Sequence, residues 1–178
     1  TGDSVLVGIE PSAVLTLRDE YPDLVDRELQ PPAVKLAENT LLIEEFLDRE
    51  IERGRIAPQF FDSRTRRILL HGHCHQKALS SLDCTVRMLS LPENHEVSII
   101  PSGCCGMAGF FGFEEEHFEL SLRIGELVLF PAIRSASAEI RIAATGTSCR
   151  HQILDGTGRL ARHPVEILRE SLLPRRLG

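Results

Sequence analysis

Residues 68–75 read ILLHGHCH, and this short stretch decides the fold. Its first three residues are large and apolar, as in a strand that is buried on both faces of a sheet, and a cysteine follows directly after the strand. The same kind of apolar run occurs at three other places, Val5–Ile9, Val97–Ile100 and Ile140–Ala144. We therefore expect at least these four buried strands, and the segments between them determine how they connect.

Helical patterns separate the predicted strands. They cover Ala33–Ile51, Lys77–Leu91 and Glu115–Ala136, with a further short one at His163–Leu168. Strands that alternate with long helices predict an α/β fold: a three-layer, mostly parallel sheet with helices on both faces, of the Rossmann-like class. We expect Pro131 to kink or end the third helix near Phe130.

Two segments of the chain share one layout. Residues 5–13 and residues 140–149 each pass from a strand into a turn of small residues that contains serine, and a helix-like pattern follows. This similarity predicts two related halves, with Ala13 standing where the second half has Cys149.

The halves suggest a domain organisation. We expect one cysteine-rich domain over residues 1–178, in which residues 1–60 end a first repeat and residues 61–178 form a second. Since the first strand opens the sequence with no upstream neighbour, we also expect the chain to be a fragment of a longer protein.

Composition narrows the class of protein. The chain has 178 residues, 42% of them hydrophobic, which suits one globular domain. Its net charge of −6 leaves no basic stripe for phosphates, so we expect no nucleic acid as a partner. No apolar run reaches the roughly 20 residues that cross a bilayer, and no signal peptide precedes the first strand, so the prediction is a cytoplasmic protein without a transmembrane segment. In that compartment the five cysteines indicate metal or redox chemistry rather than disulfides.

Four cysteines follow the ends of predicted strands. They are Cys74, Cys104, Cys105 and Cys149. In open α/β sheets the carboxyl ends of the strands line the ligand crevice, so we expect these thiols to converge there. Four thiolates at one place need a cation, and soft sulfur ligands select zinc or an iron–sulfur cluster. Cys84 lies inside a helical pattern and is interpreted as a buried hydrophobic residue.

Three motifs carry a family resemblance. They are Gly103-Cys104-Cys105-Gly106, His73-Cys74-His75 and Ser148-Cys149-Arg150-His151. Together they resemble the cysteine-rich CCG domain family, to which one of the subunits of heterodisulfide reductase belongs. The chain is most similar to the C-terminal iron–sulfur region of FAD-linked 2-hydroxy-acid oxidoreductases of the D-lactate and glycolate type.

The resemblance implies a function. The chain would hold a 4Fe-4S cluster on the four cysteines and pass electrons from FAD in an upstream region toward a quinone or similar acceptor. Its partner would be the FAD-binding oxidase region, in cis or on a separate chain, and it would lie in the cytoplasm or peripherally on the inner face of the membrane. The fragment alone would not be catalytic, since the 2-hydroxy acid (D-lactate, glycolate or 2-hydroxyglutarate) would bind the flavin region.

The sequence departs from the family at two positions. The family repeat usually ends in Cys-x-x-Cys, and Gly146 stands at the first of these cysteines. Relatives carry a cysteine where this chain has Ala13. Four ligands remain, which is enough for an ordinary cluster or a zinc ion.

Basic side chains flank the cysteines. His71, His73 and His75 alternate with Cys74 and could be ligands, hydrogen-bond donors to the site or a proton relay. We expect His73, His75, Arg150 and His151 to surround the site without binding the metal. Such neighbours tune a cluster through hydrogen bonds to sulfur and by offsetting its charge. His75 is the candidate for a replacement ligand, and Lys77 is a further source of positive charge.

Two further functions stay open. One is a zinc-binding structural or interaction module that docks the catalytic region. The other is a thiol catalyst that uses the Cys104-Cys105 pair with His75. The apolar, glycine-rich residues 107–113 next to the pair could line the site or form a docking patch, and lining is the expectation.

Overall fold

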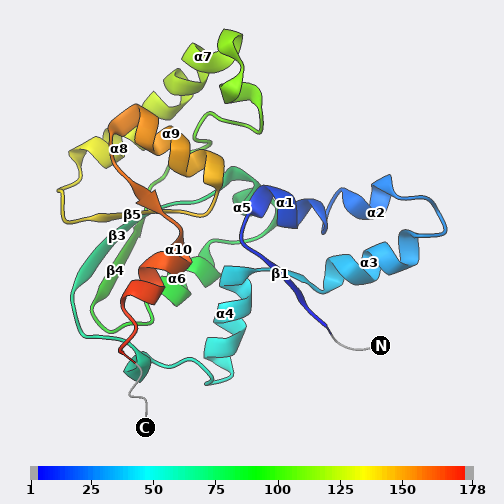
Figure 1. The fold of residues 1–178 in the computed structure, drawn as a ribbon, viewed down its shortest axis with the longest axis horizontal. Coiled ribbons are helices and arrows are strands. Elements are labelled where there is room, and N and C mark those ends of the chain that lie inside the picture. The colour runs from blue at the N-terminus through cyan, green and yellow to red at the C-terminus, as the bar shows by residue number, and fades with distance from the viewer. Residues whose placement is uncertain (1–3, 175–178) are drawn as a thin grey trace.

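The computed structural model describes residues 4–174, which form an α/β fold with parallel sheets flanked by helices (Figure 1). The main sheet has four parallel strands in the order β4-β3-β5-β6, and β1 and β2 form a separate parallel pair. The strands are β1 (Leu6–Gly8), β2 (Thr40–Leu42), β3 (Arg66–His71), β4 (His95–Ile99), β5 (Arg141–Ala144) and β6 (Ala161–Arg162). The predicted fold class is thus confirmed, and the prediction missed β2 and β6.

The helices fill the connections between strands. They are α1 (Pro11–Thr16), α2 (Tyr21–Leu24), α3 (Gln30–Glu38), α4 (Ile43–Glu52), α5 (Cys74–Leu79), α6 (Asp83–Leu89), α7 (Glu115–Glu126), α8 (Leu129–Ser135), α9 (Thr147–Thr157) and α10 (Pro164–Glu170). Two short 3-10 helices lie at Pro58–Phe60 and Phe111–Phe113. Among the described residues no helix combines the length and apolarity that crossing a membrane would need.

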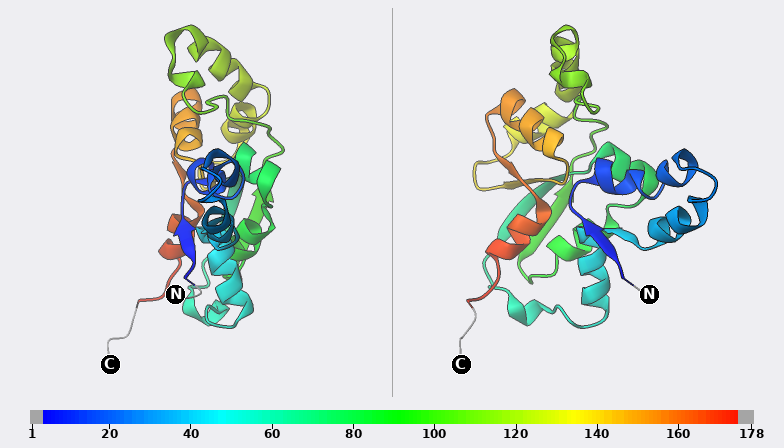
Figure 2. Two further views of the ribbon diagram at one scale, coloured as in Figure 1. Left: turned by 90° about the vertical axis from the view of Figure 1, so that its right-hand side faces the viewer. Right: turned by 45° about the vertical axis from the view of Figure 1, so that its right-hand side comes forward.

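The main sheet is covered on both faces. Leu70 in β3 packs in one apolar cluster with residues of α6 and α10, whereas Leu69 packs in another with residues of α8 and α9. Successive side chains of a strand point to opposite faces, so one apolar run supplies both clusters. Figure 2 shows α8 and α9 on one side of the strands and α4, α6 and α10 on the other, which gives three layers.

The strand order creates a switch point between β3 and β5. The chain runs from β3 through α5 and α6 to β4, then crosses back through α7 and α8 to β5 on the other side of β3. At such a reversal a crevice opens outside the carboxyl ends of the two strands. His71, the last residue of β3, pairs with Ala144, the last of β5, so both strands end level. The residues that follow them are therefore delivered to one place.

The first predicted helix, Ala33–Ile51, is wrong as a single element. The chain forms α3, then β2, then α4. All three residues of β2 are buried, and they pair with β1. At the start of α4 the Leu42 amide donates a hydrogen bond to Glu45 Oε2 over 2.9 Å, which caps the new helix. Tertiary pairing therefore overrides the continuous helical pattern.

The second predicted helix, Lys77–Leu91, is divided and begins earlier. Helix α5 starts at Cys74, where His73 Nδ1 accepts a hydrogen bond from the His75 amide over 3.2 Å. Helix α5 ends at Leu79, because the backbone of the next residue, Ser80, is extended. Before α6, the Asp83 amide donates a hydrogen bond to Ser81 Oγ. A histidine cap is outside the usual set of capping residues, so the sequence rules place the start too late.

The third predicted helix breaks slightly before the expected place. Helix α7 ends at Glu126, and Val128 leaves the helical conformation with φ −145°. Pro131 is the third residue of α8, where a missing amide costs no hydrogen bond. The proline therefore lies in the first turn of a new helix rather than at the break itself.

The shared layout of the two segments is present in the structure. Strand β1 leads to α1 at Pro11, and β5 leads to α9 at Thr147, which is the position that the alignment of the two segments pairs with Pro11. The division of the chain into repeats at residue 60 stays a prediction.

Candidate metal centre

Four of the five cysteines meet in one pocket of about 180 Å³ at the carboxyl end of the main sheet. They are Cys74, Cys104, Cys105 and Cys149. Cys74 begins α5 directly after β3, Cys149 lies in the first turn of α9 after β5, and the adjacent pair follows β4. The predicted convergence is present, and its cause is the level ending of β3 and β5 at the switch point.

The thiols interact in a row. Cys74 contacts Cys104, the adjacent Cys105 contacts both Cys104 and Cys149, and these contacts shift their pKa values. Hydrogen bonds with Cys105 lower the pKa of Cys104 and of Cys149, whereas the pKa values of Cys74 and Cys105 are raised by hydrogen bonds with Cys104. Neighbouring thiolates repel, so four together need a cation.

Gly106 fixes the turn after the cysteine pair. It has φ +106°, and a Cβ there would lie 2.1 Å from the backbone oxygen of Ser121. Its amide donates a hydrogen bond to Cys104 Sγ over 3.3 Å. Only glycine combines this backbone conformation with such a close approach, so the glycine of the motif positions a donor on the cysteine beside it.

Lys77 holds the other side of the same loop. Its ammonium group donates hydrogen bonds to the carbonyl oxygens of Ser102 and Gly103, over 2.6 and 2.7 Å. The predicted positive charge is therefore near the pair, but its direct partners are the backbone carbonyls that precede Cys104. Through them α5, the helix that begins with Cys74, is tied to the loop that carries the cysteine pair.

His71, one of the three histidines that alternate with Cys74, lies beside the buried cysteines. It ends β3, is fully buried, and its Nδ1 lies 2.8 Å from Ser102 Oγ. One of its ring nitrogens and the sulfurs of Cys105 and Cys149 all lie within 4.8 Å of one another. A histidine at the last position of a buried strand, directly before the motif, was the available signal.

His73 lies at the position of the missing family cysteine. A Cβ at Gly146 would lie 2.4 Å from His73 Cδ2 and 3.1 Å from Cys149 Sγ. A side chain at position 146 would therefore point into the site, and the His73 ring occupies that space. His75 also lines the pocket, and its Nε2 lies 3.9 Å from Glu20 Oε1.

Arg150 contacts the end of β5, and His151 lies outside the pocket lining. Arg150 Nη1 donates hydrogen bonds to the carbonyl oxygens of Ala144 and Thr145, over 3.1 and 2.6 Å. It therefore supports the end of β5 that leads to Cys149. His151 is exposed on α9 and is not among the residues that line the pocket, and its role beside the site stays a prediction.

Cys84 is separate from the other cysteines. It lies in α6, its thiol donates to the Ser81 carbonyl over 3.7 Å, and burial raises its pKa to about 11. Its interpretation as a buried hydrophobic residue agrees with this environment.

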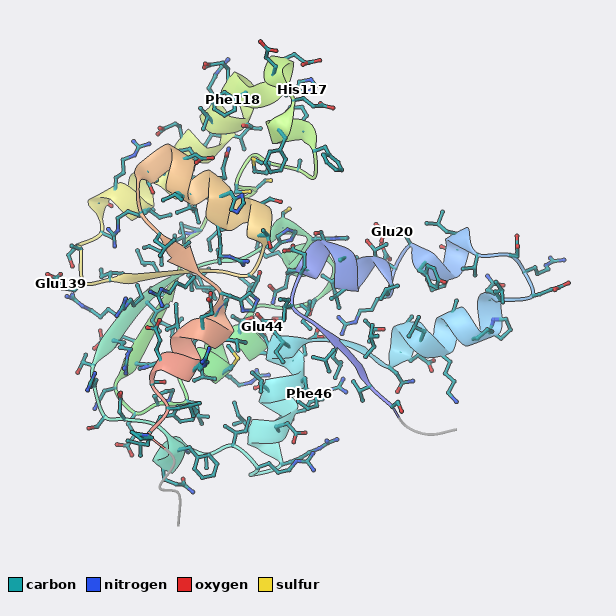
Figure 3. All side chains as sticks on the ribbon, in the orientation of Figure 1. Glu20, Glu44, Phe46, His117, Phe118 and Glu139 are labelled. Atoms are coloured by element: carbon teal, nitrogen blue, oxygen red, sulfur yellow. The ribbon has the colours of Figure 1, made fainter. Side chains whose placement is uncertain are left out.

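The apolar segment 107–113 both lines the pocket and exposes apolar side chains, the two alternatives that the sequence left open. Met107 is buried and lines the pocket together with Ala108 and Gly109. Phe110 and Phe113, however, are 83% and 60% exposed. The expectation of lining thus fails for the aromatic residues, because the chain turns outward at Gly109, where φ is +70°. They precede α7, which extends away from the sheet and carries His117 and Phe118 (Figure 3).

The segment at the start of α1, residues 10–12, also reaches the cysteine pocket. The Thr147 amide at the start of α9 donates a hydrogen bond to Glu10 Oε2 over 2.8 Å, and Ser12 lines the pocket beside Cys149. Ala13, by contrast, is exposed in α1 and offers no ligand atom. Segments far apart in the sequence therefore close the site.

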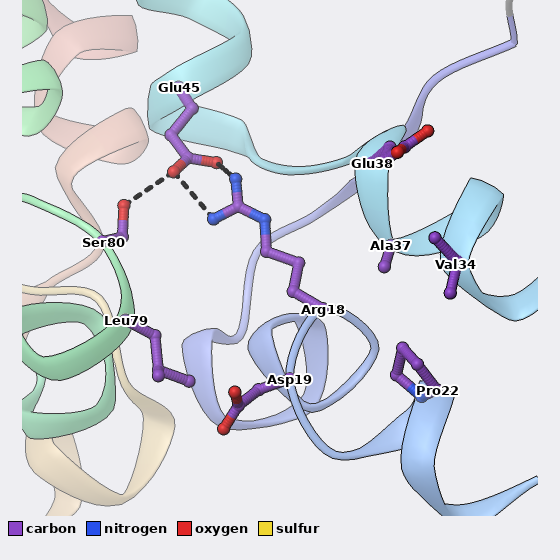
Figure 4. Close-up of a pocket in the computed structure, with 9 residues that line it drawn as sticks. All are labelled: Arg18, Asp19, Pro22, Val34, Ala37, Glu38, Glu45, Leu79 and Ser80. Atoms are coloured by element: carbon purple, nitrogen blue, oxygen red, sulfur yellow. Dashed lines mark hydrogen bonds and ion pairs between the residues drawn. The ribbon is translucent and has the colours of Figure 1, made fainter.

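A larger pocket of about 670 Å³ lies between the turn that follows α1, helices α2 and α3, the first turn of α4 and the end of α5 (Figure 4). Its one arginine, Arg18, is paired with both carboxylate oxygens of Glu45, which also accepts a hydrogen bond from Ser80. The arginine is thus neutralised, and no cysteine or histidine of the described chain lines this pocket. The cysteine pocket is therefore the candidate functional site.

Comparisons with known proteins point to oxidoreductases. No protein-family model and no solved structure matches the chain. It is 26% identical over 167 residues to one of the subunits of anaerobic glycerol-3-phosphate dehydrogenase from Escherichia coli K12, covering 94% of this chain and 40% of that protein. It is 33% identical over 168 residues to D-2-hydroxyglutarate dehydrogenase of the same strain, covering 93% of this chain and 15% of the relative, and 30% identical to the Pantoea ananatis protein of that name. The chain is thus similar along nearly its whole length to a part of each relative and spans well under half of their lengths.

Proposed function

We propose that the chain is the iron–sulfur electron-transfer region of a flavin-dependent oxidoreductase. The observation that carries the proposal is the convergence of four thiols, from three strand ends, in one pocket in which Cys105 and Cys149 are buried and Cys74 is exposed. The donor set fits such a group, because soft thiolate ligands are those that iron–sulfur clusters use. Cys74, Cys104, Cys105 and Cys149 would hold it, and when bound it would accept and release single electrons.

The residues of the chain prepare the pocket for a negatively charged group. The Gly106 amide donates to Cys104 Sγ, and Cys149 lies in the first turn of α9, where helix amides favour a thiolate. Met107 limits the access of water from the side of the loop. Hydrogen bonds to sulfur and exclusion of solvent are the means by which proteins set cluster potentials.

The two kinds of relative support an electron-transfer role over a substrate-binding one. A glycerol-3-phosphate dehydrogenase and a 2-hydroxyglutarate dehydrogenase act on different substrates by name, yet both align with more than nine-tenths of this chain. A substrate pocket would differ between such enzymes, whereas a route for electrons can be common to both. The shared region therefore supports an electron-transfer role. We infer that substrate oxidation occurs at an FAD-binding region outside this chain, with a 2-hydroxy acid as the substrate class.

The proposed partners follow from this route. The FAD-binding region would lie against the chain, in cis or on a separate chain, and a quinone or similar acceptor would receive the electrons. Free thiols suit the reducing cytoplasm, and we propose that the protein works there or on the inner face of the membrane.

A structural zinc site is the second candidate. It is favoured by the compactness of the donors, since His71, Cys105 and Cys149 offer ligand atoms within 4.8 Å of one another. Structural zinc takes four such ligands in a tetrahedron. In that case the chain would dock the catalytic region without carrying electrons.

Anaerobic purification tests the proposal. We expect a brown protein that contains iron and acid-labile sulfide and gives a spin-resonance signal on reduction. Cys105→Ser should lose most of the iron, whereas Cys84→Ser should retain it, because Cys84 lies outside the pocket. A folded, colourless protein with about one zinc per chain would favour the second candidate instead.

A further inference from the structure

One nitrogen atom beside the cysteines is buried without a partner in the part of the chain that the structure describes. His71 is 0% exposed, and its Nε2 makes no hydrogen bond of standard geometry to a described residue, although the ring lies near enough to Cys149 to lower the pKa of that thiol. Leaving a buried polar atom unpaired destabilises the folded state, so such an atom indicates a partner that binds there. Two other orphaned side-chain atoms, the carboxylate oxygens of Glu44, lie in a residue that does not line this pocket.

The surroundings of His71 fix which nitrogen faces the site. Its Nδ1 lies 2.8 Å from Ser102 Oγ, in the loop that Lys77 holds. A histidine that binds a metal commonly donates its other ring N–H to a neighbouring oxygen, which fixes the ring and leaves the second nitrogen free to bind. In the tautomer whose Nδ1–H donates to Ser102 Oγ, the lone pair is on Nε2 and can bind a metal.

His71 is also held where the pocket is most enclosed. It is the last residue of β3 and pairs with Ala144 of β5, so the backbone of the switch point fixes its position. The sulfurs of Cys105 and Cys149, its neighbours within 4.8 Å, belong to the two most buried of the four cysteines that line the pocket.

The other two histidines of the motif are less suited to bind. His73 Nδ1 accepts a hydrogen bond from the His75 amide, and the Nε2 side of its ring packs against Gly146. The side chain of His75 is 25% exposed and lies beside Glu20. Neither presents a buried, unpartnered nitrogen.

We propose that His71 Nε2 binds the metal centre directly, so that an imidazole nitrogen takes the place of one of the four thiolates in the predicted ligand set. This inference rests on the proposed function and deepens it, since it changes the predicted ligand set. A neutral imidazole adds no negative charge, and histidine ligation raises the potential of an iron–sulfur centre relative to thiolate ligation.

Pulsed spin resonance on the reduced protein tests this. The protein is purified anaerobically once with natural histidine and once with ¹⁵N-labelled histidine. We expect a strong nitrogen coupling, typical of a directly bound imidazole, that changes with the label. This measurement needs no substitution, so a folding defect cannot confuse it.

Three variants assign the nitrogen. His71→Gln should lose the coupling, and His75→Gln, the matched control at the pocket edge, should keep it. His71→Cys should keep the iron, lose the coupling and shift the midpoint potential to a more negative value, because a thiolate brings a charge that imidazole lacks. Circular dichroism and thermal unfolding check that each variant is folded.

The outcomes separate the two proposals. Iron and sulfide with no strong nitrogen coupling in the labelled protein would overturn the role of His71 and leave the proposed function standing. A coupling that survives in folded His71→Gln would do the same. Absence of iron and sulfide from the folded wild-type protein would overturn the proposed function, and this inference with it.

Discussion

Gly106 illustrates how much of the site depends on single residues. Its positive φ and its approach to Ser121 direct an amide at Cys104, while a neighbouring residue, Ala108, also has positive φ at 39°. The cysteine pair is thus held by backbone geometry rather than by side-chain packing alone. The second glycine of the motif is therefore a structural requirement of the site.

Gly106→Ala should destabilise the protein by roughly 2 kcal/mol or more, because the added methyl group meets a backbone oxygen at a strained conformation. Gly54→Ala is the control: Gly54 also has positive φ, at 71°, but nothing lies within 4 Å of its Cβ position, so about 1 kcal/mol is expected. Urea unfolding measures both. Equal losses would show that backbone conformation alone, without the contact, accounts for the effect.

At the scale of elements, the starts of α5 and α9 pack on each other. His73 caps α5, and its ring lies over Gly146, the N-cap residue of α9. The glycine at the family cysteine position and the histidine cap are therefore one arrangement. Each helix start is shaped by the residue that faces it from the other.

We expect Gly146→Ala to cost roughly 1–3 kcal/mol, since its methyl group would overlap His73 Cδ2. In the double variant His73→Ala/Gly146→Ala the overlap is absent, so the two substitutions should cost clearly less together than the sum of the single effects. Thermal or urea unfolding of the four proteins in the cycle measures the coupling. Additive losses would contradict this packing of the two helix starts.

In the whole molecule, a buried contact joins the N-terminal segment, which contains β1 and α4, to the residues that follow β6 of the main sheet. His163, which caps α10, lies 3.1 Å from the Ile9 carbonyl oxygen and 3.4 Å from Glu44 Oε1 in α4 (Figure 3). Burial raises the pKa of Glu44 to about 7. Burial also lowers the pKa of His163. Two titratable groups with shifted pKa values, Glu44 and His163, thus lie where the N-terminal segment meets the rest of the chain.

Glu44 should make stability depend on pH. Its carboxyl group keeps a proton up to about pH 7 in the folded state but loses it near 4.5 when unfolded. The folded state therefore binds more protons in this window, and the contribution of Glu44 to stability falls as the pH rises through it, by roughly 3 kcal/mol in all. His163 acts in the opposite direction at the acid end, because it must be neutral in the folded state.

Glu44→Gln isolates this contribution. The loss of stability of the wild type between pH 5 and pH 8, followed by urea unfolding, should be smaller in the variant. Glu38→Gln makes the same change of charge at a position that is not buried and should follow the wild type. A Glu44→Gln curve parallel to that of the wild type would refute the expectation.

Local patterns in the sequence were enough to predict the α/β class, four of the six described strands and the four cysteines that meet at the strand ends. These follow from local pattern: apolar runs, alternation of strands with helices, and thiols placed directly after strands. It also separated Cys84 from the rest, because a cysteine inside a helical pattern lies away from the strand ends.

The other features depend on contacts between distant parts of the chain. Strand β2 interrupts a continuous helical pattern because its residues are buried against β1, and the exposure of Phe110 depends on a turn at Gly109. The orphaned nitrogen of His71 and the His73 ring over Gly146 arise because β3 and β5 end level, which brings together residues about 75 positions apart. Local pattern carries no information about which distant residues will share a space, and that sharing sets the ligand environment of the site.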